Sequence, residues 1–297
     1  MLNFKPIEPQ DSEWLVPLLH TSGYMTSTYS FVTLYMWSKV YNTQVAAFGD
    51  HAIARSDRDG TLRYLYPAGH GDEKEAVDAI IQDIRQQGKP AFLYGVSVEA
   101  KQRLEQWYPG LFEIEAARGD YEYIYDRAEL AELPGKKFQK KRNHVSRFVR
   151  ENPDWEFHPL TSEAVPQVRQ FNREWASMPD NREDEGIQTE HQAIEMLFDH
   201  FDQLPLEGGY ITAGGRIVAF SFGSAINERI FDTNVEKALY EVNGAYNIIN
   251  REMARQVCGR YEMINREDDV DSEGLRKAKL SYNPVIIEPK YRATFVG

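Results

Sequence analysis

A basic segment near the middle of the chain is the first stretch whose residues could do chemistry. Between Leu133 and Glu151 the sequence reads LPGKKFQKKRNHVSRFVRE. Its cationic residues are Lys136, Lys137, Lys140, Lys141, Arg142, Arg147 and Arg150. Because the whole chain has 46 acidic and only 34 basic residues, this exclusively basic run indicates a local site for an anion. A solvated surface helix is the simpler alternative.

The same segment has the pattern of an amphipathic helix. At about 100° per residue, Phe138, Val145 and Val149 share one face, with Phe148 at its edge. The opposite face collects Lys136, Lys140, Asn143, Arg147 and Arg150. Lys141 and Arg142 flank the apolar stripe instead. Since an unpaired charge beside a core is costly, we expect these two side chains to meet an anion or a carboxylate.

Motifs for other kinds of chemistry are missing from the sequence. It contains no G-x-S-x-G, no H-E-x-x-H, no cysteine pair and no G-x-x-x-x-G-K-[ST]. Cys258, the one cysteine, falls within an expected helix and is better explained as a small buried side chain than as a nucleophile. We therefore expect no metal site and no cysteine chemistry.

Composition and length limit the class of protein. A chain of 297 residues suits two domains, and 42% hydrophobic with 12% aromatic residues is enough for packed cores. A net charge of −12 disfavours nonspecific binding to nucleic acids over the whole protein surface. A single cysteine suits a reducing compartment, and we find neither a leader peptide nor an apolar run of about 18 residues. We expect a cytoplasmic protein without a transmembrane segment.

Hydrophobic periodicity predicts the same order of elements twice: strand, two helices, three strands, helix, strand, helix, two strands. In the first half, the helices and strands with the clearest pattern are 44–48, 52–55, 62–66, 73–87, 92–96, 98–107, 112–116 and 121–125. In the second half they are 155–159, 162–177, 185–201, 209–213, 217–224, 230–235, 245–257, 261–265, 272–280, 285–288 and 291–295. We expect an α+β protein with two similar domains, 1–128 and 153–297, and a basic bridging helix at 129–152.

Several strings resemble the family named for the C-terminal domain of phosphatidylglycerol lysyltransferases. They are Tyr29-Ser30-Phe31, Tyr94-Gly95-Val96, LPGKKF at 133–138, KRNH at 141–144, VEKA at 235–238, Gly244-Ala245-Tyr246, INRE at 264–267 and GLRKAKLSY at 274–282. The resemblance covers nearly the whole chain. It implies two tandem GNAT (acyl-CoA N-acyltransferase) domains, each a mixed, mostly antiparallel sheet flanked by helices. By kinship with Fem-type transferases, it also implies transfer of an aminoacyl group from a charged tRNA.

In the GNAT fold, the phosphates of the donor lie at the start of the helix after the fourth strand. The resemblance assigns this position to residues 241–246, including Gly244 and Tyr246. Glu241 and Tyr246 stand where acyl-CoA enzymes carry Arg or Gln and a small residue, which weakens a CoA site. The equivalent helix of the first half begins with Asp72 and Glu73, which complement the helix dipole themselves. We expect the first domain to be structural or substrate-shaping.

The resemblance also implies a reaction site where the fourth and fifth strands of the second domain diverge. Arg266 and Glu267 would stand there opposite Glu236, and either glutamate could take a proton from an amine or hold a substrate ammonium. Ion pairing of Arg266 with a neighbouring acid is the simpler alternative. The further candidates for binding the donor are Asn234, Asn265, Arg276, Lys277 and Lys279, with Tyr29, Tyr246 and Tyr282 as possible stacking partners.

Three hypotheses follow. The first is an acyl- or aminoacyltransferase with charged tRNA as donor and an amine, a hydroxyl compound or a lipid headgroup as acceptor. The second is an N-acyltransferase that uses acyl-CoA. The third is a non-catalytic module that binds RNA or an anionic membrane surface through the basic helix, with binding that weakens as salt is added.

Overall fold

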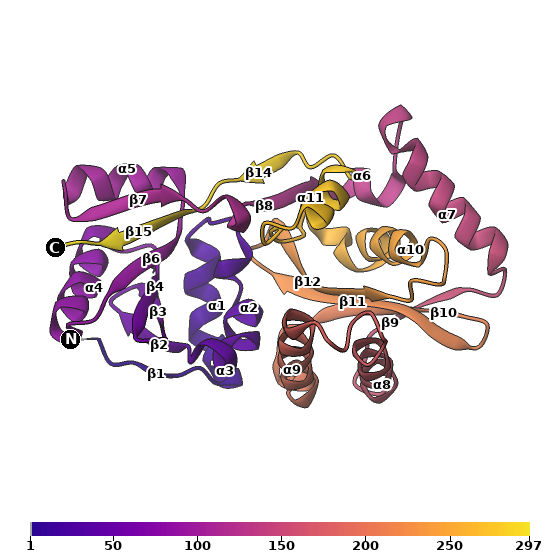
Figure 1. Ribbon diagram of the computed structural model, residues 1–297, viewed down its shortest axis with the longest axis horizontal. Coiled ribbons are helices and arrows are strands. Elements are labelled where there is room, and N and C mark those ends of the chain that lie inside the picture. Colours follow the sequence, from indigo (N-terminus) through magenta and orange to yellow (C-terminus); the bar gives the residue numbers. More distant parts are fainter. Residues whose placement is uncertain (1) are drawn as a thin grey trace. The chain divides into compact units, whose positions relative to one another are not determined.

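The computed structural model describes residues 2–297, which form two compact units built from discontinuous stretches of the chain. The first unit contains the residues up to Glu122 together with 267–276 and 287–297, and the second contains 123–266 and 277–286. Each unit has one β-sheet with helices packed against it (Figure 1). The expected α+β class with two mixed, mostly antiparallel sheets is confirmed.

An eight-stranded sheet organises the first unit. Its order is β1-β2-β3-β4-β6-β15-β7, with β5 paired to β3, and β4 and β6 run parallel to each other. The strands are β1 (Lys5–Pro6), β2 (Gln44–Phe48), β3 (His51–Arg58), β4 (Thr61–Leu65), β5 (Ala68–Gly69), β6 (Ala91–Val96), β7 (Phe112–Ala116) and β15 (Tyr291–Phe295).

Side-chain alternation along β4 separates the two faces of this sheet. Leu62 and Tyr64 lie in the core with Ile80 and Ile84 of α4 (Glu73–Gln87) and with Leu104 of α5 (Val98–Trp107). Arg63, between them in sequence, projects to the other face. Three helices also contact this unit's sheet or one another: α1 (Ser12–Thr21), α2 (Phe31–Met36) and α3 (Ser38–Tyr41).

A seven-stranded sheet organises the second unit, in the order β14-β8-β13-β12-β11-β10-β9. The strands are β8 (Glu122–Asp126), β9 (Glu156–Pro159), β10 (Glu207–Ala213), β11 (Arg216–Ala225), β12 (Ile230–Ala238), β13 (Met263–Asn265) and β14 (Ile286–Glu288). β12 and β13 run parallel and pair at three positions, the last being Asp232 with Asn265. Beyond that pair β13 ends, whereas β12 continues to Ala238. The two strands therefore part on the side where Glu236 lies.

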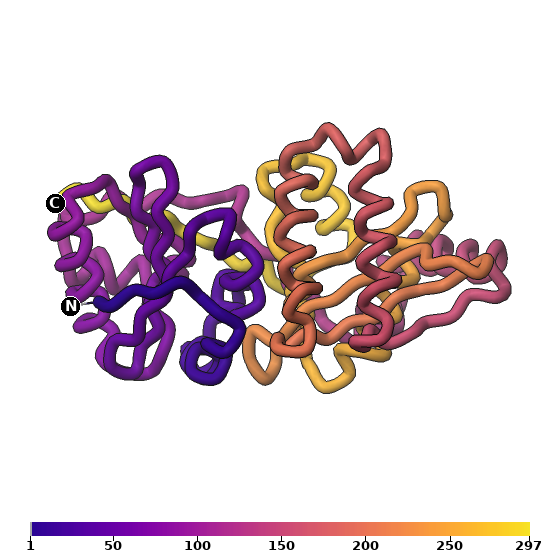
Figure 2. The backbone as a smooth tube through the Cα atoms, turned by 90° about the horizontal axis from the view of Figure 1, so that it is seen from below, coloured from indigo at the N-terminus to yellow at the C-terminus, as the bar shows by residue number. Residues whose placement is uncertain are grey.

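Helices cover both faces of the second sheet. α8 (Val165–Ala176) and α9 (Glu185–Asp199) pack together on one face, and α10 (Ala245–Glu252) lies on the other (Figures 1 and 2). α10 continues into a π-helical turn at Met253–Val257. The remaining helices are α6 (Arg127–Glu132), α7 (Gln139–Glu151) and α11 (Glu273–Leu280). Across residues 2–297, no helix combines the length and apolar character needed to cross a bilayer.

The basic segment forms the expected amphipathic helix. A 3₁₀ turn at Lys136–Phe138 leads into α7, whose buried residues are Val145 and Phe148. Val149, expected on the apolar stripe, is 37% exposed, and Phe148 occupies the buried side instead. The reason is that α7 packs on α10, next to Gly244, so its contact face is turned toward Phe148.

Two strands do not lie in the sheet that their position in the sequence predicts. The strand expected at the end of the first half, β8, pairs with β13 in the second sheet. The last strand of the chain, β15, lies between β6 and β7 in the first sheet. Their assignment to consecutive halves was wrong, because strand partners are selected by tertiary packing and leave no trace in local periodicity.

Candidate functional site

A buried ion pair lies where β12 and β13 part. Arg266, directly after β13, places Nη2 2.8 Å from Oε1 of Glu236 on β12. The two side chains are only 16% and 11% exposed. Asn250 of α10 donates from Nδ2 to the other carboxylate oxygen of Glu236 at 3.2 Å. Both oxygens of Glu236 are thus engaged by groups from separate elements, so this carboxylate holds the guanidinium in one place.

A tyrosine and a lysine complete the cluster. The guanidinium carbon of Arg266 lies 4.9 Å from the ring centroid of Tyr282, and Nζ of Lys141 lies 3.7 Å from the same centroid. Both distances are in the range of cation–π contacts. We call Lys141, Glu236, Asn250, Arg266 and Tyr282 the Arg266 cluster. All five belong to the second unit, and they come from α7, β12, α10 and the segments that follow β13 and α11.

Hydrogen bonds to the surrounding backbone and side chains fix the cluster. Asn247 donates from Nδ2 to the Tyr282 hydroxyl oxygen at 2.6 Å. Lys279 donates from Nζ to the carbonyl oxygen of Arg266. The hydroxyl of Tyr125 in turn donates to the carbonyl oxygen of Lys279 at 2.9 Å. The position of Arg266 is therefore set through both its backbone and its side chain.

The cluster has two cations and one carboxylate, and this shifts its pKa values. Burial and the charge of Arg266 lower the pKa of Lys141 to about 8, while Glu236 partly opposes them. Although burial acts in the other direction, Glu236 raises the pKa of Arg266 above its usual value. Burial raises the pKa of Tyr282 to about 12. Near neutral pH, Arg266 is charged and Tyr282 is protonated, whereas Lys141 is the group able to gain or lose a proton.

Two buried polar atoms beside the cluster have no hydrogen-bond partner among residues 2–297. They are Oδ1 of Asn250 and Oγ of Ser221, which pairs in register with Glu236 across β11 and β12. Buried polar groups are nearly always paired in native proteins. Unpaired atoms next to an ion pair are consistent with a site that receives polar groups from outside the chain.

The other cations of the basic segment are arranged differently from Lys141. Lys137 pairs with Glu129 at 2.7 Å, and Arg142 donates to the carbonyl oxygens of Leu133 and Gly135. Asn143 accepts a hydrogen bond from Gln139. Lys136 and Lys140 are exposed and have no ion pair within residues 2–297. Lys141 lies at the edge of the buried face against the Tyr282 ring, and Arg142 closes the turn before its own helix. Within residues 2–297 neither forms the ion pair with a carboxylate that we expected.

The predicted asparagines and the residues near α11 have structural partners. Asn234 is buried and donates to Asp232 at 2.8 Å. Asn265 is fully buried at the end of β13, in register with the same aspartate. Glu267 follows with a left-handed backbone, φ 57°. Arg276 donates to both carboxylate oxygens of Asp269, at 2.8 and 2.9 Å.

Of the two remaining predicted cations, Lys279 anchors the Arg266 carbonyl as described above, and Lys277 is exposed on α11. Lys141, Glu236 and Arg266 are thus the predicted residues that come together around Tyr282.

Close packing explains why residue 244 is a glycine. It is the N-cap of α10 with φ 79°, and a Cβ there would lie 2.5 Å from the carbonyl oxygen of His144 and 3.1 Å from Cβ of Phe148. The backbone of α7 therefore covers the place where the sequence suggested that donor phosphates bind. The ring centroid of Tyr246, the second residue of α10, lies 5.9 Å from that of Tyr240.

Asn247 and Asn250 are site residues that sequence reasoning missed. They stand three positions apart, on one face of α10. Asparagine is a poor helix former, so its repetition along one helical face was a signal that these side chains have a role beyond the helix.

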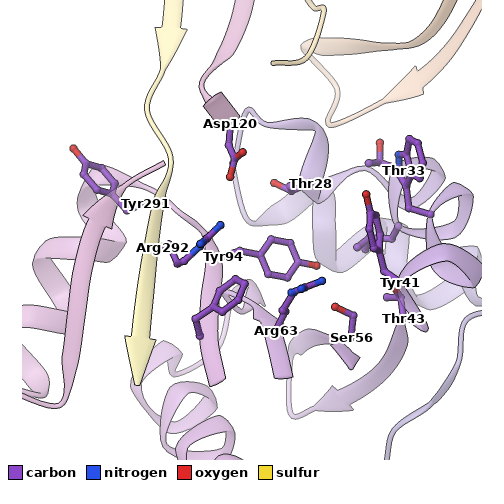
Figure 3. Close-up of a pocket in the computed structure, with 13 residues that line it drawn as sticks. Thr28, Thr33, Tyr41, Thr43, Ser56, Arg63, Tyr94, Asp120, Tyr291 and Arg292 are labelled. Carbon is purple, nitrogen blue, oxygen red and sulfur yellow. The ribbon is translucent and has the colours of Figure 1, made fainter. Parts of the chain in front are cut away.

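The first unit contains a separate pocket of about 410 Å³ (Figure 3). Its walls come from β3, β4, β6 and β15 on one side and from α2, α3 and neighbouring loops on the other. None of its lining residues lies at the start of α4, where Asp72 and Glu73 complement the helix dipole.

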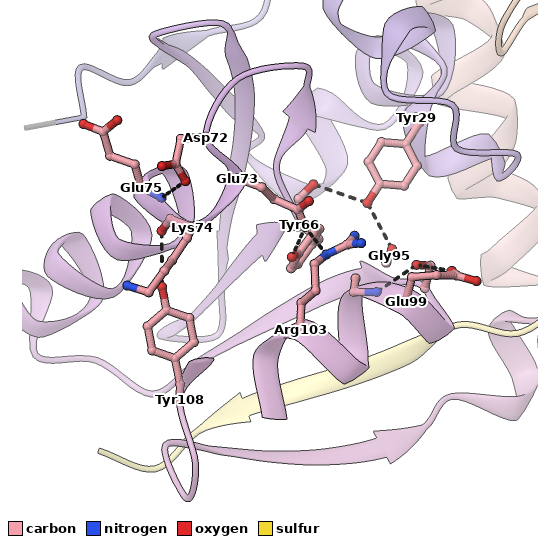
Figure 4. A network of polar contacts seen from close by, with 12 residues as sticks. Tyr29, Tyr66, Asp72, Glu73, Lys74, Glu75, Gly95, Glu99, Arg103 and Tyr108 are labelled. Carbon is pink, nitrogen blue, oxygen red and sulfur yellow. Dashed lines mark hydrogen bonds and ion pairs between the residues drawn. The ribbon is translucent and has the colours of Figure 1, made fainter. Parts of the chain in front are cut away.

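At the start of α4, Asp72 caps the helix through Glu75 N, and Glu73 accepts hydrogen bonds from Tyr66 and Arg103 (Figure 4). Figure 4 also shows Tyr29 donating to the Gly95 carbonyl at 3.0 Å, which joins two of the strings that carried the resemblance.

Comparison with known proteins agrees with the resemblance. The profile of the family described as "Phosphatidylglycerol lysyltransferase, C-terminal" matches residues 21–294. An uncharacterized protein of Mycoplasmoides gallisepticum, MYCGA3080, is 24% identical over 191 residues, which are 63% of this chain and 60% of that relative's length.

Three solved structures show the fold. A conserved protein of unknown function from Bacteroides thetaiotaomicron is 36% identical over the full length of both chains, with a TM-score of 0.96. L-PGS from Bacillus licheniformis is 18% identical over 96% of this chain and 92% of its own, with a TM-score of 0.68. A tandem GNAT protein from the clavulanic acid biosynthesis pathway is 9% identical over 99% and 98%, with a TM-score of 0.50. The tandem GNAT fold is therefore confirmed.

Proposed function

The chain belongs to the family of phosphatidylglycerol lysyltransferase C-terminal domains, and from this premise we propose that it moves an aminoacyl group from a charged tRNA to an amine, a hydroxyl compound or a lipid headgroup. The family and the fold support a transferase role. The donor, the acceptor and the residue roles given below are our proposal.

The observation that carries the proposal is the Arg266 cluster. Arg266, held by Glu236, lies beside Lys141 and two unpaired polar atoms at the place where two strands part. In acyl transfer, negative charge develops on the carbonyl oxygen as the acceptor attacks, and fixed cations stabilise it best when they need not reorganise. Arg266 meets this requirement, because Glu236 and the Lys279 contact hold it in place.

We assign a role to each group in the transfer. The acceptor nitrogen or oxygen attacks the ester carbonyl carbon and forms the new bond, while Arg266 stabilises the oxyanion. Lys141, in its neutral form, accepts the proton from the acceptor. The intermediate then collapses, the bond from the carbonyl carbon to the tRNA ribose oxygen breaks, and Lys141 returns the proton to that oxygen. Glu236, with both oxygens engaged, positions Arg266 and does not act as the base.

The exposed cations of α7 fit a second task. Lys140 lies on the outer face of the helix, as does Lys136 in the turn before it, and neither is neutralised by a carboxylate within residues 2–297. Such side chains attract a polyanion from a distance without forming a specific contact. We propose that they attract the tRNA, while Lys141 takes part in the chemistry.

Two features disfavour acyl-CoA as the donor. The backbone of α7 covers Gly244 at the start of α10, and Glu241 lies within the same stretch, in an ion pair with Arg216 at 3.6 Å. A CoA pyrophosphate needs free N–H groups at such a helix start. Calorimetry with CoA tests this point, and heat of binding at millimolar CoA would favour the acyl-CoA hypothesis.

Neighbouring lysines provide a matched test of the proposed function. Purified protein is mixed with a panel of labelled aminoacyl-tRNAs and with two sets of acceptors, a lipid extract and small amines. We expect transfer by the wild-type protein, a loss of roughly a hundredfold in Lys141→Ala, and a change of no more than a few fold in Lys140→Ala. Lys140→Ala and Lys141→Ala each remove one positive charge from neighbouring positions of the same helix, so they differ mainly in where that charge lies. Equal losses in both variants, or no transfer with any pair, would contradict the proposal.

A further inference from the structure

The pocket of the first unit has features of a ligand site that the proposed transfer reaction does not use. All residues that line it belong to the first unit. Two arginines reach it from the sheet, Arg63 on β4 and Arg292 on β15. Their guanidinium carbons lie 5.8 and 4.7 Å from the centroid of the same ring, that of Phe92 on β6. The two cations therefore flank one aromatic side chain.

Neither arginine is neutralised by the protein. Within residues 2–297, neither the Arg63 nor the Arg292 side chain forms an ion pair or a hydrogen bond, and both guanidinium groups lie near the Phe92 ring. By contrast, Arg55 on the neighbouring strand pairs with Asp83 at 2.8 Å. Two unpaired guanidinium groups at one pocket favour an oxyanion, because arginine binds carboxylates and phosphates through paired N–H donors.

The rest of the wall is aromatic and hydroxylic. Trp37 and Tyr41 line the pocket from the helical side, opposite Phe92 and Tyr94. Figure 3 shows the Tyr94 hydroxyl and the Arg63 guanidinium pointing into the space that Tyr41 faces, whereas Tyr291 points away from it. Burial raises the pKa of Tyr94, so its hydroxyl stays protonated and is able to donate a hydrogen bond. A mostly apolar wall with a few directed polar groups is typical of small-molecule pockets.

One carboxylate also borders this pocket. In Figure 3 the Asp120 carboxylate points into the pocket from the side where Arg292 lies, and within residues 2–297 it forms no ion pair with Arg63 or Arg292. With two guanidinium groups and one carboxylate, the pocket keeps a net positive charge. An oxyanion is therefore favoured near the arginines, and a hydrogen-bond donor on the ligand is favoured near Asp120.

We propose that the pocket of the first unit binds a small molecule that joins an oxyanion, either carboxylate or phosphate, to an aromatic body. The oxyanion lies at Arg63 and Arg292, and the body lies among Phe92, Trp37 and Tyr41. A volume of about 410 Å³ is at the lower end of the range for such ligands. The proposal does not depend on the transfer reaction, so either can fail without the other.

Direct binding of defined probes tests the site. Phenyl phosphate, phenylacetate and L-phenylalanine represent a phosphate, a carboxylate and a carboxylate with an ammonium group, and saturation-transfer NMR with titration gives their affinities. We expect at least one to bind the full chain with a dissociation constant of about 1 mM or below. The probe with the highest affinity shows whether the site prefers a phosphate or a carboxylate. Tighter binding of phenylalanine than of phenylacetate would show that Asp120 contributes to binding.

Controls separate this site from nonspecific attraction. Benzyl alcohol lacks the charge and inorganic phosphate lacks the ring, and we expect both to bind at least tenfold more weakly than the best probe. Arg63→Gln and Arg292→Gln should each weaken that probe at least tenfold. Arg85→Gln, on the exposed side of α4, removes the same charge and should leave the affinity unchanged.

Three results would overturn the proposal: no binding of any anionic aromatic probe, affinity that survives in both pocket variants, or inorganic phosphate that binds as tightly as phenyl phosphate. Arg292 is exposed, so its variant should fold normally and keeps the test valid even if Arg63→Gln does not fold.

Discussion

The buried pair between Lys290 and Glu122 leads to a quantitative prediction about the first unit. Nζ of Lys290 lies 2.7 Å from Oε1 of Glu122, and the two side chains are 6% and 0% exposed. Ser27 also donates to this carboxylate, from its backbone N at 2.7 Å and from its hydroxyl at 2.8 Å. Lys290 directly precedes β15, the strand that returns to the first sheet. The pair therefore lies where the chain re-enters this unit.

Replacing Lys290 with Met keeps an apolar stem and removes the ammonium group. The Glu122 carboxylate is then buried beside the Ser27 donors without its counter-ion. Breaking a buried pair in this way typically costs about 3–5 kcal/mol, because the remaining charge has lost its partner but not its desolvation penalty. Changing both residues, in Glu122→Gln with Lys290→Met, removes that charge and should recover most of the loss.

An exposed pair of similar geometry serves as the control. Lys89 lies 2.6 Å from Asp57, with the two side chains 43% and 34% exposed. Lys89→Met should lower the free energy of unfolding by less than about 1 kcal/mol. Urea-induced unfolding, followed by circular dichroism, compares the midpoints of the four proteins. Equal effects of Lys290→Met and Lys89→Met, or a double variant no more stable than Lys290→Met alone, would refute the reasoning.

The Lys290–Glu122 pair also predicts the direction in which the stability of the protein changes with pH. Although burial opposes it, Glu122 raises the pKa of Lys290 above its usual value of 10.5. A raised lysine pKa stabilises the folded state fully below that value, and this contribution is lost as the pH rises through the folded-state pKa. The difference in stability between the wild type and Lys290→Met should therefore shrink above about pH 10.5.

Three further measurements test individual residues. Acylation of Lys141 by an amine-directed reagent, followed by mass spectrometry, should rise with an inflection near pH 8, and an inflection near pH 10 would contradict the burial argument. Gly244→Ala should destabilise the protein by roughly 2 kcal/mol or more, whereas Gly259→Ala, with open space at its Cβ, should change stability by less than about 1 kcal/mol in thermal unfolding. Cys258, whose pKa is raised by burial, should resist a thiol reagent until the protein unfolds; rapid labelling of the native protein would be unexpected.

Local periodicity predicted many elements closely. The apolar stripe of Ala76, Val77, Ile80, Ile81 and Ile84 gave the bounds of α4, and short apolar runs located β7 and β15. These elements depend on residues a few positions apart, so the pattern along the chain contains the information. The same reasoning put Lys141 beside the apolar stripe of the basic segment, where it lies.

Which strands pair with one another could not be predicted in the same way. Nothing in residues 291–295 indicates that they pair with β6 and β7, because almost two hundred residues separate them from those strands. Val149 and Phe148 show the same limit on a smaller scale, since the packing of α10 on α7 decided which of them is buried. Both outcomes depend on contacts between distant segments.

By itself, the sequence determined the class of fold, its internal duplication, the family and the helical character of the basic segment, because each of these is expressed in residue patterns along the chain. Only the tertiary structure decided which cation of that helix meets Glu236, Arg266 and Tyr282, and that Gly244 is covered by a neighbouring helix. It also brought two arginines more than two hundred positions apart to one aromatic ring. A site made from several elements is defined by their packing, and spacing within any one of them does not encode it.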